Sequence, residues 1–97
     1  MTLEEMTALF QKHSDEYLKF ENVLLRLSLV PDLCAFLILE SIAHTATHIV
    51  VCAEHDEIWL SHDPEIVAAN ATEEQLIDLL RCGVLWDAST DSFRMNV

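Results

Sequence analysis

The chain has 97 residues, of which 17 are Asp or Glu and 5 are Lys or Arg, so its formal net charge is −12. About half of the residues are apolar (52%), while Gly occurs once and Pro twice, which is the composition of one folded domain and not of a disordered chain. The charge disfavours nucleic acid and anionic membranes as direct partners, because both are polyanions. We expect a single compact domain over residues 1–97.

The first predicted element is a helix that begins at residue 3. Thr2 and Glu5 form a T-x-x-E capping box, and apolar residues then recur at spacings of three and four. One interpretation is a single helix over residues 3–27, and the other is a break where Ser14 and Asp15 cap a new start. The heptad spacing indicates either a homodimer seam through this helix or a face packed on the domain's own core.

A second helix is predicted over residues 31–44. Pro31 suits the first helical position, and Asp32 lies beside the positive end of the helix dipole. The segment LCAFLILESIA is apolar nearly all round, which is typical of a buried central helix. Its longest apolar run is far shorter than the roughly 20 residues that span a bilayer.

The remaining pattern predicts a hairpin, two helices and a second hairpin. Strands are expected at 48–53 and 57–61, because HIVVCAE and IWLS flank the polar corner EHDE. A helix follows from Asp63-Pro64 to about Asn70, and another begins after Thr72, which forms a capping box with Gln75. Gly83 suits a left-handed cap at the end of that helix.

The last segment, VLWDASTDSFRMNV, has alternating apolar residues on both sides of a polar centre, which predicts a hairpin ending at Val97. The fold class expected from these elements is α+β. Helices should pack on a small antiparallel sheet made of two β-hairpins, in the order α-α-β-β-α-α-β-β.

Acidic residues are concentrated in the middle of the chain. No Lys or Arg occurs from Leu27 to Leu80, where ten acids fall, and the segment EHDEIWLSHDPE alone holds five. Gathered on one face, these carboxylates would imitate the regular charges of a phosphate backbone and fit a basic groove. The candidate protein-binding residues are Glu54, Asp56, Glu57, Asp63, Glu65, Glu73 and Glu74, with Trp59 as an apolar anchor.

Helix starts explain part of this acidity. The acids at 63, 65, 73 and 74 lie at predicted caps or first turns, where the helix dipole favours negative charge. The hairpin corner has no such local reason for three charges within four residues, because a turn accepts Asn, Gly or Ser. Trp59 and Trp86 are alternative anchors, although Trp in a small domain also serves as core.

A metal site is the other chemical possibility. Five candidate ligands fall within nineteen residues: His44, His48, Cys52, His55 and His62. No C-x-x-C or H-E-x-x-H pattern accompanies them, so no metal or cofactor is expected. No catalytic residues are expected either, because carboxylates beside Cys52 suppress its thiolate and no glycine-rich loop or nucleophile elbow occurs.

Three segments, PDLCAFLILE, AEHDEIWL and ATEEQLIDLLRCGV, resemble short uncharacterised proteins of phage and prophage genomes, over residues 31–97. This resemblance implies no particular activity or fold. Small size and acidity are also similar to those of acidic anti-CRISPR proteins and other DNA mimics.

Acidity and the compositional similarity to DNA mimics together predict an inhibitor that covers the basic nucleic-acid-binding site of a host protein. The absence of a signal-peptide pattern and of a spaced cysteine framework predicts a cytoplasmic location, in the host if the chain is phage-encoded. One alternative is an immunity protein or antitoxin against a basic nuclease toxin. Another, from a different class, is a regulatory module that binds metal through the His and Cys residues.

Overall fold

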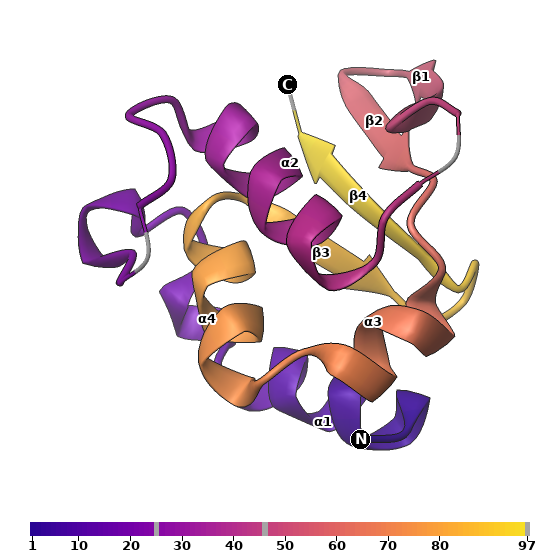
Figure 1. Ribbon diagram of the computed structural model, residues 1–97, viewed down its shortest axis with the longest axis horizontal. Helices are drawn as coiled ribbons and strands as arrows, with labels where there is room; N and C mark the ends of the chain where they lie inside the picture. Colours follow the sequence, from indigo (N-terminus) through magenta and orange to yellow (C-terminus); the bar gives the residue numbers. More distant parts are fainter. Residues whose placement is uncertain (25, 46, 97) are drawn as a thin grey trace.

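The computed structural model describes residues 1–24, 26–45 and 47–96 (Figure 1). The elements in chain order are α1 (Leu3–Lys12), two 3-10 turns (Ser14–Glu16 and Phe20–Asn22), α2 (Pro31–Ile42), β1 (Val50–Glu54), β2 (Glu57–Leu60), α3 (Pro64–Asn70), α4 (Glu73–Arg81), β3 (Val84–Asp87) and β4 (Ser92–Asn96). The predicted α+β class and the predicted order of helices and hairpins are confirmed. Val97 lies outside the described residues.

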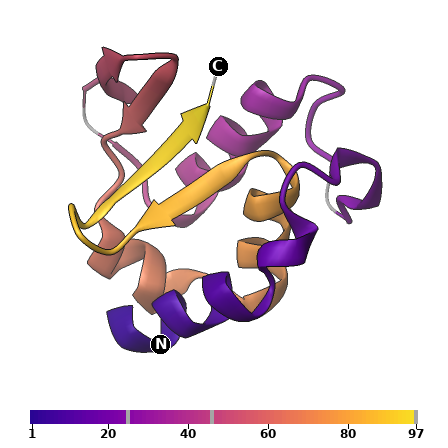
Figure 2. The ribbon, with the colours of Figure 1, turned by 180° about the vertical axis from the view of Figure 1, so that it is seen from behind.

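The strands form one antiparallel sheet in the order β1-β2-β4-β3, so the two hairpins are joined through β2 and β4. The register places Met95 beside Ile58 on one side and Val84 on the other, and Leu60 beside Phe93. These side chains share one face because alternate residues of a strand point the same way. Helix α2 covers that face, in front of β3 and β4 in Figure 1 and behind them in Figure 2.

The core lies between this sheet face and the helices. Its largest fully buried side chains are Phe93, Met6, Ile38, Leu39, Leu76, Leu79 and Leu80. The ring of Phe93 lies 6.3 Å from that of Phe10 and 5.0 Å from that of Trp86. The apolar face of α1 is therefore used inside the domain, since both Met6 and Phe10 are buried.

The first helix is much shorter than the heptad spacing permits. It ends at Lys12, and Leu18 adopts a left-handed φ of 64° while its N–H donates to the carbonyl of Leu80 at 3.1 Å. Leu24 and Leu27 are 68% and 43% exposed. The continuous helix over residues 3–27 is wrong, and a break after α1 is confirmed. The predicted cap by Ser14 and Asp15 is wrong, because the 3-10 turn over Ser14–Glu16 has no side-chain cap.

Helix α2 is less buried than its composition predicts. Cys34 and Ile38 face the core, but Leu33 and Leu37 are 47% and 39% exposed, so one side of the helix is open to solvent. The helix also ends at Ile42, two residues before the predicted end. No helix in the described part of the chain is both long and apolar enough to cross a bilayer.

The helix signals in the second half are confirmed in detail. Asp63 accepts a hydrogen bond from the N–H of Glu65 at the start of α3, and Thr72 and Gln75 complete a capping box on α4. Gly83 follows α4 with a φ of 99°. The first hairpin is shorter than predicted, with strands over residues 50–54 and 57–60 in place of 48–53 and 57–61.

Candidate functional site

The first hairpin turns through two residues, His55 and Asp56, which both have left-handed φ values of 51° and 65°. Positive φ at both central positions is the signature of a type I′ turn, whose twist matches that of the strands. Glu54 and Glu57 flank the turn and lie directly opposite each other. The turn therefore brings together the three acids that the sequence analysis assigned to this corner.

The three carboxylates of this corner differ in their exposure to solvent and in their partners. Glu57 is about one-third exposed, and its carboxylate accepts a hydrogen bond from the guanidinium of Arg94 on β4 at 3.1 Å. Glu54 is 62% exposed and lies 3.2 Å from the ring of His55, which is itself open to solvent. Asp56 is exposed at the tip. Two of the three carboxylates are thus presented to solvent, and the third is tied to the sheet.

The four acids of the later helices occupy another part of the surface. Asp63 and Glu65 lie at the start of α3, and Glu73 and Glu74 at the start of α4. Strand β2 runs from the hairpin turn toward α3, so the turn is at the end of the hairpin away from that helix. In Figures 1 and 2 the start of α4 lies at the end of the molecule away from the hairpin, whereas α3 begins between the two, on the same side as the hairpin.

The predicted acids therefore do not form one ridge, because those beyond the hairpin corner lie at two separate helix starts. Glu73 lies 2.8 Å from the ring of His13, at the C-terminal end of α1. Glu65 lines a shallow surface cavity together with Glu4 from the first turn of α1. Caps and first turns account for these positions, because carboxylates there are stabilised by free backbone N–H groups.

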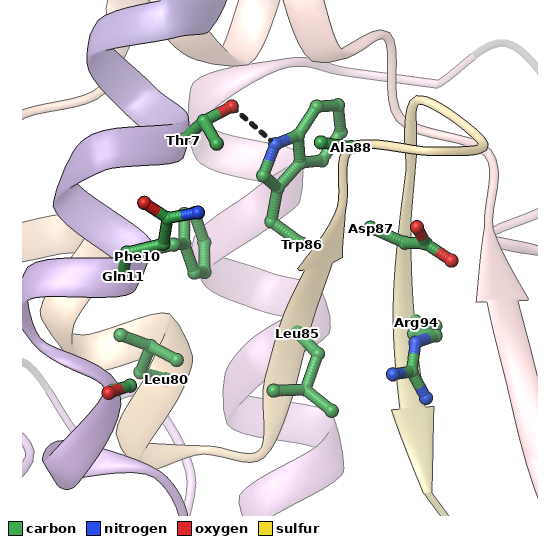
Figure 3. Close-up of a pocket in the computed structure, with 10 residues that line it drawn as sticks. Thr7, Phe10, Gln11, Leu80, Leu85, Trp86, Asp87, Ala88 and Arg94 are labelled. Carbon is green, nitrogen blue, oxygen red and sulfur yellow. Dashed lines mark hydrogen bonds between the residues drawn. The ribbon is translucent and has the colours of Figure 1, made fainter.

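Trp59 lies on β2 between Cys52 of β1 and Arg94 of β4, on the sheet face opposite the core. It is half-buried, and so it remains available as an apolar contact beside the hairpin acids. Trp86 belongs to a different region. Its indole N–H donates to Thr7 on α1 at 2.8 Å, and its ring packs on Phe93, so it is fixed between helix and sheet (Figure 3).

Sequence reasoning missed the cavity beside Trp86. Its volume is about 350 Å³, and α1 and the second hairpin line it with Phe10, Gln11, Leu85, Asp87 and Arg94 among others (Figure 3). The carboxylate of Asp87 accepts hydrogen bonds from Ser89, which lower the pKa of that carboxyl. No periodicity in the sequence indicates that α1 and β3 lie side by side.

The candidate metal ligands are dispersed. His62 is buried, and its Nε2 lies 2.8 Å from Glu40, whose other carboxylate oxygen lies 2.8 Å from the exposed His44. Burial alone raises the pKa of Glu40, but hydrogen bonds from His62 and Thr45 outweigh it and lower the pKa. Within residues 1–24, 26–45 and 47–96, no group of three His, Cys, Asp or Glu side chains is arranged to hold a metal ion.

The three cysteines differ in environment. Cys52 is exposed on β1, whereas Cys34 and Cys82 are buried. Burial, followed by the neighbouring Cys34, raises the pKa of the Cys82 thiol, which disfavours its thiolate.

The chain was compared with protein families, curated proteins and solved structures, and no match was found in any of them.

Proposed function

We propose that this protein is an acidic protein-binding inhibitor that occupies the basic nucleic-acid-binding site of a larger protein, such as a host defence or DNA-processing protein. The observation that carries the proposal is the acidic hairpin, defined as β1, β2 and the turn between them. All five residues of β1 are exposed, and the two solvent-facing carboxylates of Glu54 and Asp56 lie at its tip. Exposed carboxylates at the end of an open sheet edge complement the basic side chains of a groove that is built for a polyanion.

The charge of the whole chain supports the same kind of partner. A net charge of −12 attracts a basic surface over a Debye length of roughly 10 Å and accelerates encounter at low salt. The acids at the starts of α3 and α4 add to this long-range attraction. Contact itself is assigned to the hairpin, with Trp59 as the neighbouring apolar side chain.

The proposal is tested by capture of proteins from a bacterial lysate on the immobilised chain, with release by salt and by duplex DNA as separate measurements. We expect the captured protein to bind DNA by itself and to be released by competing DNA. Replacement of Glu54 and Asp56 by Lys should weaken capture at least tenfold. The matched control replaces Glu73 and Glu74 by Lys, which changes the net charge by the same amount.

The control variant should bind only a few times more weakly, because those acids act at long range. Equal losses in the two variants would refute a contact through the hairpin. Capture that competing DNA does not affect would refute occupation of a nucleic-acid-binding site.

A further inference from the structure

Strand β1 is an open edge of the sheet. The strand order leaves β1 and β3 as the two outer strands. Strand β3 lies beside α1, where Trp86 donates its hydrogen bond to Thr7, but β1 makes its ladder with β2 only (Figure 2). All five β1 residues are exposed, and Val51 is 62% exposed. An edge of this kind is a template on which another strand can pair.

The turn geometry identifies which backbone groups are directed outward. In a hairpin with a two-residue loop, the residues that flank the loop share both ladder hydrogen bonds, and the next pair shares none. Glu54 and Glu57 are the flanking pair, and Ala53 and Ile58 are the next. The N–H and C=O of Ala53 therefore point away from β2. The register shifts at Val51, so the regular part of the edge is residues 52–54.

Strand β1 has few of the features that normally protect an edge strand from pairing with another strand. Protective edges contain Lys, Pro or inward-pointing charge, or they are covered by another element. Within VVCAE the only such features are the irregularity at Val51 and the carboxylate of Glu54. A cationic strand is not repelled by Glu54 and gains from it.

The charge around the edge favours one kind of occupant. Glu54 and Asp56 lie at its end, and no Lys or Arg occurs from Leu27 to Leu80. A second copy of the chain would bring another net charge of −12 to the same place. An extended segment with Lys or Arg side chains instead brings opposite charge. Backbone hydrogen bonds then supply affinity, and the flanking side chains supply specificity.

We propose that β1 accepts an extended, Lys- or Arg-bearing segment of the partner protein as a fifth strand of the sheet. This inference rests on the proposed function, because it specifies how the basic partner is bound. It adds that the partner contributes a strand, and it assigns the contact to the backbone of Ala53.

The first test is amide hydrogen exchange by NMR with a defined probe, a peptide of about ten alternating Lys and Thr residues. The Ala53 amide should exchange fast in the free protein and at least tenfold more slowly with the peptide. The Ile58 amide should not change, because it faces β4. A peptide of alternating Glu and Thr should have no effect. Unchanged exchange at Ala53 in the presence of bound Lys-Thr peptide would overturn the inference.

The second test is Ala53→Pro, with Ala53→Ser as the matched control. Proline removes an N–H that faces away from β2, and a strand conformation of Cys52 is compatible with a following proline. We expect Ala53→Pro to weaken peptide and partner binding at least tenfold at unchanged charge. Ala53→Ser keeps the backbone donor and should bind like the parent. Protection of the Ile58 amide in both variants checks that the hairpin is intact.

The outcomes separate this inference from the proposed function. If Ala53→Pro binds as well as Ala53→Ser while the Glu54 and Asp56 variant has lost binding, strand addition is refuted and the acidic inhibitor stands. If no basic partner is bound at all, the proposed function is refuted, and strand addition is refuted with it. Protection of Ala53 that rises with protein concentration, without peptide, would identify a second copy as the occupant and overturn the inference.

Discussion

The guanidinium of Arg94 donates a hydrogen bond to the carboxylate of Glu57 at 3.1 Å, across the pair of strands that joins the two hairpins. Both side chains are about one-third exposed. One of the three acids at the hairpin corner is thereby balanced by the protein's own cation. The corner is consequently less charged toward a partner than its sequence implies.

A ranking of carboxylate substitutions follows from this pair. Asp56→Asn should lower the association rate constant with the Lys-Thr peptide about two- to threefold at low salt, because its charge is unbalanced. Glu57→Gln should lower it less, since Arg94 already offsets that charge. Stopped-flow measurements at several salt concentrations provide the comparison. A larger effect of Glu57→Gln would mean that its ion pair opens on binding.

Arg81 stabilises the fold by joining two carboxylates from different segments. It lies 2.8 Å from Glu16 and 3.1 Å from the buried Asp78, and the pKa of Arg81 is raised, first by Glu16. Arg81→Met should lower the free energy of unfolding by about 2–4 kcal/mol, because Asp78 loses this cation inside the protein. Urea unfolding measures the change.

The control for Arg81 is Arg26→Met. The Arg26 side chain lies on the surface over the ring of Phe20 and donates to a backbone carbonyl. Its replacement should cost about 1 kcal/mol or less. Equal costs for the two arginines would contradict a specific contribution from the pair with Asp78.

The pH dependence of stability reports on Glu40. Because its pKa in the folded protein lies below the ordinary value of 4.5, the folded state binds this proton less readily than the unfolded state does. The resulting stabilisation is present above about pH 4.5 and is lost as the pH falls through the lower, folded-state pKa. Glu40→Gln removes this contribution, so its free energy of unfolding should fall less steeply with acid.

Urea unfolding between pH 3 and 7 makes this comparison. Exposed Glu74 provides the control, since Glu74→Gln removes a carboxylate that is not held by a buried histidine. Parallel pH profiles for Glu40→Gln and the parent protein would show that the contact with His62 contributes nothing.

The backbone conformation at position 83 requires glycine. Its φ of 99° is unfavourable for residues with a side chain, and an added Cβ would lie 3.1 Å from Cδ2 of Leu18. Gly83→Ala should destabilise the protein by about 1–2 kcal/mol. Gly83→Asn should cost less than Gly83→Ala, because Asn tolerates positive φ. Thermal unfolding of both variants measures the loss of stability. Equal losses would indicate that the contact with Leu18, and not the positive φ, causes the destabilisation.

Local signals in the sequence were sufficient for most helix boundaries. Thr2 with Glu5, Thr72 with Gln75, and Gly83 each act within one turn of the chain, so their effect is visible without knowledge of the fold. The end of α1 is different. Its heptad spacing continues past Lys12, but the hydrogen bond from Leu18 to Leu80 joins segments that are distant in sequence. Periodicity does not reveal such a contact.

The candidate site was predictable only in part. The acidic corner at Glu54, Asp56 and Glu57 is contiguous in the chain, so its location on a turn could be predicted. Its separation from Glu73 and Glu74 depends on where β2 leads and how α3 and α4 pack, which is set by tertiary structure. The pairing of Glu57 with Arg94 likewise required the register of β2 against β4.

The stretch without cations that contains the hairpin also determines how a complex can be mapped. Trypsin cleaves after Arg26 and next after Arg81, so α2, both strands of the hairpin, α3 and α4 remain in one long peptide. Amine-directed cross-linkers likewise find no lysine there. Proteolysis after glutamate would divide this peptide. Cross-linkers that couple carboxylates to amines would join the tip of the hairpin directly to lysines of the partner protein.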